Sequence, residues 1–227
     1  MDASQPVPSF ETSQTRLELD GHSIELTVLT NLDALFDQLI AKGPDHEDVR
    51  DERIPYWAEL WPAAIALSRY LLETYPSLEG KNVLELGCGL GLPGIVAGLL
   101  GAEVTLTDYL PEPLDFARRN WEQNLSRPAR FELLDWRNPQ PALAADLVLA
   151  SDIAYEKRAF PFLPHAFQTL CRPGGTILAS DPSRSASPEL FQSLLPAQGF
   201  LIQTFPYREA RNGHVFQIQV HAIRLPR

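Results

Sequence analysis

From residue 54 onward the chain alternates between two kinds of hydrophobic pattern. Short apolar runs are typical of buried strands, and apolar residues that recur every three or four positions are typical of helices. The short runs predict strands at Val83–Leu86, Glu103–Thr107, Arg130–Leu134, Leu147–Ala150 and Thr176–Ser180. The recurring pattern predicts helices at Pro62–Tyr75, Pro93–Leu100, Pro111–Asn124, Lys157–Leu170 and Pro188–Ala197. This alternation predicts an α/β fold with a Rossmann-like, doubly wound and mostly parallel sheet.

The last part of the chain departs from this alternation. The expected strands Phe200–Tyr207 and Val215–Ile223 are separated only by a loop that contains Gly213. Two strands joined in this way pair antiparallel, because a parallel connection needs a long crossover. We therefore expect a seven-strand sheet that ends in an antiparallel hairpin.

The first 53 residues form a separate pattern. Thr15–Leu19 and Ile24–Leu29 alternate apolar and polar residues around Asp20-Gly21, which predicts a β-hairpin. Residues 1–14 are expected to be a loose tail, and residues 32–40 and 42–53 a short helix and an exposed loop. We therefore divide the chain into an N-terminal tail and hairpin extension, residues 1–53, and a core domain, residues 54–227.

Charge and cysteine content narrow the class of protein. The formal net charge of −10 argues against a sequence-independent grip on nucleic acid and would favour a basic partner. Cys88 and Cys171 offer neither metal-ligand spacing nor a disulfide framework, so we expect no metal site. The N-terminus has no apolar segment of the signal-peptide kind, and no stretch approaches a membrane span. The default expectation is a cytoplasmic monomer with no nucleic-acid or membrane partner.

The strongest motif is VLELGCGLG, in which Gly87, Gly89 and Gly91 follow the first strand of the core. A strand, a glycine turn and a helix form the part of open α/β sheets that binds nucleotide-like ligands. Position 92 is Leu, so the third glycine of the G-x-G-x-x-G dinucleotide fingerprint is missing. The spacing therefore disfavours a dehydrogenase.

Acidic residues stand at the ends of successive strands, where such sheets bind their ligands. Glu85, just before the glycines, could hold an ammonium group directly or through water. Asp108 follows the second strand, where a carboxylate accepts hydrogen bonds from ribose hydroxyls; the alternative is a helix cap. Asp135 and Trp136 follow the third strand and could contact an adenine ring; the alternative is a turn beside a half-buried Trp.

The fourth strand is followed by SDIAYE, residues 151–156. Asp152 and Tyr155 would place a carboxylate and a phenol at the mouth of the crevice, unless the Asp only caps the next helix. Arg184, after the fifth strand, could contact substrate or be exposed in a turn. The segment YWAELWP, residues 56–62, places two Trp side chains where they could cover a ligand or plug the sheet.

Together, IPYWAELWPAAIALSRYL, NVLELGCGLGLPGIVAGLLGAEVTLTDY, DW and ASDIAYE resemble the class I, seven-strand S-adenosylmethionine-dependent methyltransferases. Within that class the chain is similar to the family-16 group, which has an Asp-x-x-Tyr motif after the fourth strand and consists largely of protein lysine methyltransferases. The segment ASDPSR is similar to bacterial relatives of the electron transfer flavoprotein β-subunit lysine methyltransferase. The resemblance covers residues 54–205 and identifies residues 54–227 as a methyltransferase domain.

The resemblance also implies roles for individual residues. It implies that Asp152 and Tyr155 face the substrate. It implies cofactor contacts for Trp61, Glu85, Gly87, Gly89, Gly91, Asp108, Asp135, Trp136 and Ser151. The implied cofactor is S-adenosyl-L-methionine, with S-adenosyl-L-homocysteine as the product.

Three functions remain open on the sequence. The favoured one is methylation of a lysine on a protein substrate. The second is methylation of a small amine such as nicotinamide, which would need an enclosed acceptor pocket. The third is a non-catalytic protein that binds the cofactor and keeps the fold.

Overall fold

The protein is described here by a computed structural model that covers residues 10–50, 55–155, 157–211 and 213–226. Residues 1–9 of the expected tail and the expected domain boundary after residue 53 lie outside these residues. Residues 12–14, which were expected to belong to that tail, instead begin the first strand of the N-terminal hairpin. The main strands are β3 (Asn82–Leu86), β4 (Glu103–Asp108), β5 (Arg130–Leu133), β6 (Ala145–Ser151), β7 (Cys171–Asp181), β8 (Leu201–Arg211) and β9 (His214–Arg224). The helices are α1 (Leu32–Ala41), α2 (Glu47–Arg50), α3 (Pro62–Thr74), α4 (Leu92–Leu99), α5 (Pro111–Asn124), α6 (Leu163–Leu170) and α7 (Leu195–Ala197).

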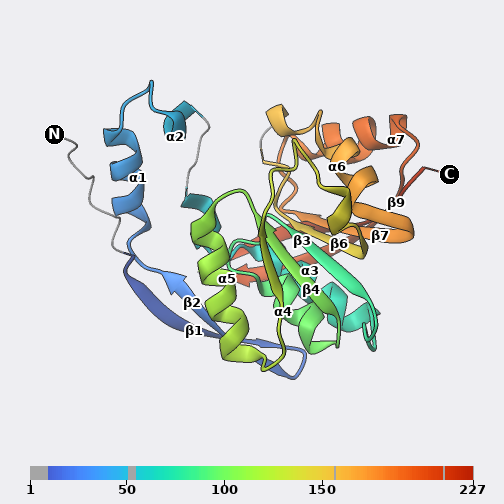
Figure 1. Ribbon diagram of the computed structural model, residues 1–227, viewed down its shortest axis with the longest axis horizontal. Helices are drawn as coiled ribbons and strands as arrows, with labels where there is room; N and C mark the ends of the chain where they lie inside the picture. The colour runs from blue at the N-terminus through green and yellow to red at the C-terminus, as the bar shows by residue number, and fades with distance from the viewer. Residues whose placement is uncertain (1–9, 51–54, 156, 212, 227) are drawn as a thin grey trace.

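The seven strands form one sheet in the order β5-β4-β3-β6-β7-β9-β8 (Figure 1). Strands β3 to β7 pair in parallel, and β9 pairs antiparallel with both β7 and β8. The predicted fold class is therefore confirmed, including the antiparallel C-terminal hairpin. The order reverses at β3 and β6, which places a ligand crevice at their carboxyl ends.

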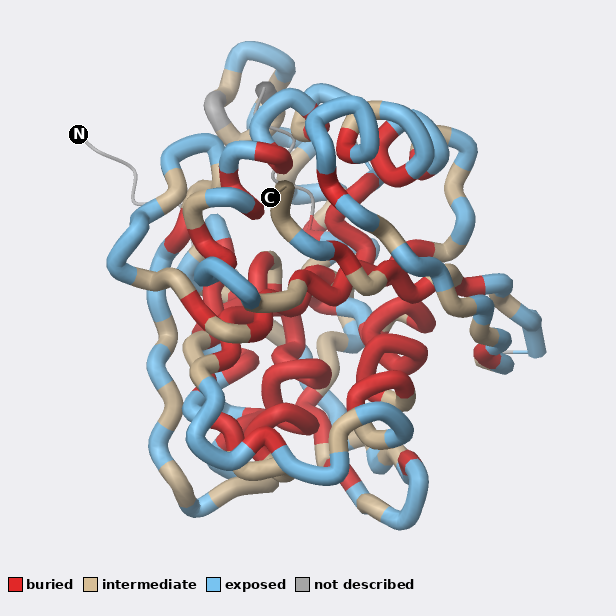
Figure 2. The backbone as a smooth tube through the Cα atoms, turned by 90° about the vertical axis from the view of Figure 1, so that its right-hand side faces the viewer, coloured by how far each residue is buried: buried red, intermediate tan, exposed pale blue. Residues whose placement is uncertain are grey.

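Helices cover both faces of the sheet and separate two hydrophobic cores. Val83, Leu147 and Leu149 pack on one face with residues of α3, α4 and α5. Leu84 and Val148, their neighbours along the strands, pack on the other face with residues of α6. Figure 2 shows these buried segments in the interior, with exposed loops around them. Strands buried on both faces explain why the sequence reads as continuous apolar runs.

The predicted N-terminal hairpin is present as β1 (Thr12–Leu19) and β2 (His22–Leu29), paired antiparallel in a separate sheet. It lies against α5 (Figure 1). Two side chains of α5 bind the backbone of β2. Asn120 Oδ1 accepts the N–H of Thr27 at 2.7 Å, and Asn124 Oδ1 accepts the N–H of Glu25 at 2.9 Å.

Three elements differ from the prediction. Residues 47–50 of the expected loop form α2. The expected helix Lys157–Leu170 is a short 3-10 turn, Lys157–Ala159, followed by α6 from Leu163. Prolines at 161 and 164 explain the later start, because proline has no N–H to donate and is tolerated in the first turn of a helix. The expected helix Pro188–Ala197 is mostly a π-helix, Glu189–Leu194.

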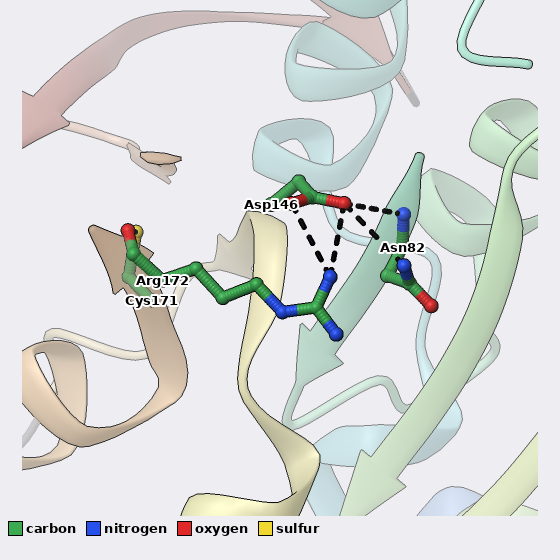
Figure 3. A network of polar contacts seen from close by, with 4 residues as sticks. All are labelled: Asn82, Asp146, Cys171 and Arg172. Atoms are coloured by element: carbon green, nitrogen blue, oxygen red, sulfur yellow. Dashed lines mark hydrogen bonds and ion pairs between the residues drawn. The ribbon is translucent and has the colours of Figure 1, made fainter. Parts of the chain in front are cut away.

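Polar contacts among Asn82, Asp146 and Arg172 join the amino ends of β3, β6 and β7 (Figure 3). The crevice lies at the opposite, carboxyl ends of these strands. Arg172 Nη1 lies 3.3 Å from both carboxylate oxygens of Asp146. Asp146 Oδ2 also accepts the backbone N–H of Asn82 at 2.9 Å. Hydrogen bonds from Asn82, with a further one from Arg172, lower the pKa of Asp146. This Asp–Arg pair therefore ties β6 to β7 far from the glycine loop.

Candidate functional site

The glycine loop between β3 and α4 has a backbone that only glycine adopts without strain. Gly87, Gly89 and Gly91 have φ angles of +59°, +50° and +80°. A side chain at Gly89 would also place its Cβ 2.9 Å from the backbone oxygen of Trp57. The loop therefore packs closely against residues 56–61, the segment before α3, and both line one cavity. Positive φ and close approach together explain the alternating glycines.

This cavity of about 630 Å³ lies at the carboxyl ends of the strands. Ten of the eleven predicted site residues line it: Trp61, Gly87, Gly89, Gly91, Asp108, Asp135, Trp136, Ser151, Asp152 and Tyr155. Its size is within the range of pockets for cofactors and drug-sized ligands. The sheet topology therefore brings the predicted residues together, although they span nearly one hundred positions of the chain.

Glu85 is the exception, because it does not line the cavity. Its side chain is fully buried, and its Oε2 accepts the N–H of Gly94 at 2.9 Å. Burial raises the pKa of Glu85 to about 8, against the hydrogen bond from Gly94. Glu85 therefore lies behind the glycine loop, under α4. The expected direct contact with an ammonium group does not fit this position.

Asp108, at the end of β4, connects the glycine loop to the next strand. Its Oδ2 accepts the N–H of Gly89 at 3.1 Å, and its Oδ1 accepts the N–H of Tyr109 at 2.8 Å. Burial raises the pKa of Asp108 to about 6, although the backbone hydrogen bonds oppose this. The carboxyl group is held by backbone donors on one side and borders the cavity on the other. It does not cap α5, whose N-terminus has no side-chain cap.

Asp135 and Trp136 border the next part of the cavity. The Asp135 carboxylate accepts hydrogen bonds from Arg137 Nε at 2.8 and 2.9 Å. The Trp136 ring approaches the glycine loop so closely that a Cβ at Gly87 would lie 3.4 Å from it. A flat aromatic surface and a carboxylate with spare lone pairs thus stand side by side.

Aromatic side chains form another wall. The rings of Tyr56 and Trp61 lie 6.1 Å apart, and those of Tyr56 and Tyr155 lie 6.0 Å apart. Trp61 Nε1 donates to the backbone oxygen of Tyr56 at 2.7 Å, which fixes the indole. Tyr56 and Tyr155 are both partly exposed, so this wall extends from the cavity to its rim.

Asp152 follows the last residue of β6 and also lines the cavity. Its backbone adopts a left-handed conformation, with φ of +51°. Its carboxylate accepts two hydrogen bonds from Arg184, from Nε at 3.1 Å and from Nη2 at 2.9 Å. Burial raises the pKa of Asp152, and Arg184 counteracts this shift.

Sequence reasoning left Arg184 undecided between a substrate contact and a turn, and it missed the partner. The signal was present, since Asp152 and Arg184 follow β6 and β7, which are neighbours in the sheet. Arg158 and Phe162 also line the cavity and were not singled out. In the part of the chain that the structure describes, no group of three His, Cys, Asp or Glu side chains could hold a metal ion. Nor is any described helix long and apolar enough to cross a membrane.

Comparison with known proteins gives a consistent result. A family model described as lysine methyltransferase matches residues 50–197. Protein N-lysine methyltransferase METTL21A of Danio rerio is 35% identical over 173 residues, 73% of this chain and 78% of that protein. EEF1A lysine methyltransferase 3 of Mus musculus is 34% identical over 171 residues, 73% of each chain.

Among solved structures, the T. thermophilus 16S rRNA N2 G1207 methyltransferase RsmC, in complex with AdoMet and guanosine, has a TM-score of 0.63. The match covers 100% of this chain and 53% of that one at 17% identity, which supports the fold alone. The resemblance to bacterial relatives of the flavoprotein-modifying enzyme stays a prediction.

Proposed function

The chain belongs to the lysine methyltransferase family, and from this premise we propose that it methylates a lysine side chain of a protein. The methyl donor is S-adenosyl-L-methionine and the product is S-adenosyl-L-homocysteine. The observation that carries the proposal is a single cavity that joins the glycine loop and Asp108 to Asp152 and Tyr155. We call the part of the cavity beside the glycine loop and Asp108 the donor half, and the part beside Asp152 and Tyr155 the acceptor half.

The residues of the donor half fit this cofactor. The glycine loop offers a close approach that any Cβ would disturb, as the 2.9 Å distance at Gly89 indicates. We assign Asp108 to the ribose hydroxyls, because a buried carboxylate beside the loop can accept both hydrogen bonds. We assign Asp135 and the Trp136 ring to the adenine, and Trp61 and Ser151 to the reactive end. Glu85 supports the loop from behind, through Gly94.

The acceptor half must present an amine with a free lone pair. When bound, the cofactor supplies a methyl group on a positively charged sulfur. The acceptor amine forms the new N–C bond with its lone pair as the S–CH3 bond breaks, and the electron pair of that bond stays on the sulfur of S-adenosyl-L-homocysteine. The nitrogen must therefore be neutral before transfer, and it releases a proton to water afterwards. The walls of Tyr56, Trp61 and Tyr155 exclude water and disfavour a charged amine. Each oxygen of Asp152 keeps a lone pair that can accept an N–H of this amine and orient it.

The rim of the cavity supports a protein as the acceptor. Tyr56, Tyr155 and Phe162 are about two-fifths exposed, at 38%, 42% and 41%. Aromatic side chains that reach solvent around a site provide contact area for a partner that cannot enter as a whole. The aliphatic stem of a lysine side chain could then pass between them.

The test is incubation of the protein with tritiated S-adenosyl-L-methionine and a heat-treated lysate of its native host. We expect a labelled protein band whose acid hydrolysate contains labelled methyl-lysine. The Asp152→Ala variant should label this band at least about 100-fold more slowly, the usual size of a lost positioning or proton-transfer group. Its affinity for the cofactor, measured by calorimetry, should stay near that of the wild type.

Other outcomes would replace the proposal. Label confined to the small-molecule fraction would indicate a small-amine methyltransferase. Measurable cofactor binding without any label would indicate a non-catalytic binding protein. Full turnover by Asp152→Ala would remove this residue from the acceptor site.

A further inference from the structure

The ion pair between Asp152 and Arg184 lies inside the acceptor half of the cavity. Arg184 uses Nε and Nη2 to contact one oxygen each, at 3.1 and 2.9 Å. The Asp152 side chain is almost buried, with 7% of it exposed, whereas 39% of the Arg184 side chain is exposed. The guanidinium carbon lies 5.8 Å from the centre of the Trp61 ring, within range of a cation–π contact. Arg184 therefore covers Asp152 from the side on which a substrate would arrive.

The backbone on both sides holds this pair in place. Asp152 and Ser183, the residue before Arg184, are two of the three described non-glycine residues with positive φ, at +51° and +54°. Such conformations cost energy and persist only where the surroundings fix them. The N–H of Asp152 donates to the Ser180 oxygen at 2.7 Å, and the N–H of Ser187 donates to the Arg184 oxygen at 3.0 Å. The segments that carry Asp152 and Arg184 each contain a residue with strained backbone and a backbone hydrogen bond that fixes the chain there.

The start of the Arg184 loop has a further anchor. Asp181 Oδ2 lies 3.0 Å from Nε2 of His221, a buried residue of β9. The other ring nitrogen of His221 lies 2.9 Å from Thr204 Oγ1 of β8. Three neighbouring strands therefore fix the point from which Arg184 reaches back to Asp152. This arrangement is more than an exposed turn needs.

Charge explains what the pair could do. A buried carboxylate without a partner would attract the ammonium form of a lysine and keep it protonated. A protonated lysine has no lone pair and cannot accept a methyl group. We propose that Arg184 is a positioning residue that neutralises the charge of Asp152. The carboxylate then does not act as the counter-ion of a lysine ammonium group, and the acceptor enters the site as a neutral amine. The inference rests on the proposed function and deepens it.

Other ionisable groups also lie around the pair. Asp181, from β7, is a second negative charge near both partners, and its own contact with His221 lowers its pKa against the effect of burial. Without Arg184, Asp152 and Asp181 would together favour an ammonium group. Further ionisable side chains that line the cavity include Tyr56, Glu59, Tyr155 and Arg158.

The experiment compares the pH dependence of kcat in the wild type and in Arg184→Gln. The acceptor is the unmethylated form of the protein that the labelled band identifies, and both substrates are saturating, so that kcat reports groups in the complex. In Arg184→Gln the acid limb of the profile should move about 1–3 pH units to higher pH. Near neutral pH, kcat should fall about tenfold or more while KM for the acceptor falls or stays constant.

Two variants separate charge from structure. Arg184→Lys keeps a positive charge beside Asp152 and should restore the acid limb to within about half a unit of the wild type, with a lower plateau. Arg172→Gln removes the guanidinium from the Asp146 pair, which joins the same two strands at the opposite edge (Figure 3). It should leave both the limb and the plateau unchanged.

The results that would overturn the inference are distinct from those that would overturn the proposed function. A wild type that forms no methyl-lysine removes the proposed function. A wild type that forms methyl-lysine, with an Arg184→Gln profile lowered equally at every pH, leaves the function and removes the inference. A higher KM with an unmoved limb would make Arg184 a simple binding contact and would also contradict the inference.

Discussion

Asp108 is a carboxyl group whose chemistry depends on burial. Its pKa is about 6, raised by burial although three backbone N–H groups lower it. Only the ionised form can accept hydrogen bonds from both ribose hydroxyls in the role that we propose. The affinity for the cofactor should therefore be higher above pH 6 than below it.

This gives a prediction for the affinity of S-adenosyl-L-methionine. Because binding favours the ionised group, Kd at about pH 5 should be roughly tenfold above Kd at about pH 8. The Asp108→Asn variant should bind roughly 10–100-fold more weakly at pH 8, the cost of losing one charged hydrogen-bond acceptor. Its Kd should also be nearly independent of pH over this range.

Calorimetry from about pH 5 to about pH 8 measures both effects. Asp115→Asn is a matched control, because Asp115 is an exposed residue of α5. It should reproduce the pH dependence of the wild type. If Asp108→Asn retained the wild-type pH dependence, another group would be responsible and the ribose assignment would lose its support.

At the scale of elements, α5 connects the N-terminal hairpin to the glycine loop. Asn120 is fully buried in this helix, where its Oδ1 accepts the N–H of Thr27 and its Nδ2 donates to the Leu90 oxygen at 3.0 Å. Asn124, one turn later, binds only the hairpin and its own helix, among the described contacts. One asparagine thus reaches both the hairpin and the loop, and its neighbour does not reach the loop.

These contacts predict different effects for two alanine variants. Asn120→Ala and Asn124→Ala should each lower the free energy of unfolding by about 1–3 kcal/mol, because each leaves polar backbone groups without a partner. Only Asn120→Ala should also weaken cofactor binding, by about threefold to tenfold, since it frees the Leu90 carbonyl within the glycine loop.

Urea unfolding gives the stability and calorimetry gives the affinity. Equal affinities for the two variants would mean that the hairpin and the loop are not coupled through Asn120. The hairpin would then only add stability to the core.

The elements also indicate how far the sequence could predict this protein. The positions of most strands and helices, the antiparallel end of the sheet and the place of the cavity at the strand ends follow from the alternation of apolar runs and helical periods. The order of the strands in the sheet was not predicted, because local patterns do not specify which strands pair. Glu85 is the one predicted site residue that does not line the cavity, and its place in the strand explains why. It shares the face of Val83 and so lies under α4, whereas, among the strands and the loops that follow them, the residues that line the cavity stand at the last position of a strand or beyond it. Local patterns do not predict the Asp152–Arg184 pair, because it joins residues 32 positions apart that come together only through the pairing of β6 with β7.

At the scale of the whole molecule, the residues that we assign to the cofactor and those that we assign to the acceptor lie on different halves of the sheet. The glycine loop and Asp108 belong to the half of the sheet under α4 and α5, and Asp152 and Arg184 belong to the half next to β7. The segment with Tyr56 and Trp61 crosses between them and borders both halves of the cavity. In the proposed assignment the donor and acceptor contacts belong to different halves of the sheet, so the variants proposed above should affect different measurements.

The net charge of −10 adds a property of the whole surface. An acidic protein attracts a lysine-rich partner over distances longer than a hydrogen bond, and salt weakens this attraction because the Debye length is about 8 Å at physiological ionic strength. We therefore predict that KM for the protein acceptor rises severalfold between about 50 and about 300 mM KCl, while kcat changes little. Kd for S-adenosyl-L-methionine, which we have assigned to the interior of the cavity, should change by less than about twofold and serves as the control. Initial rates at several acceptor concentrations provide the measurement. A KM that does not depend on salt would mean that the acceptor is recognised by the aromatic rim and the Asp152 pocket alone, with no contribution from the acidic surface.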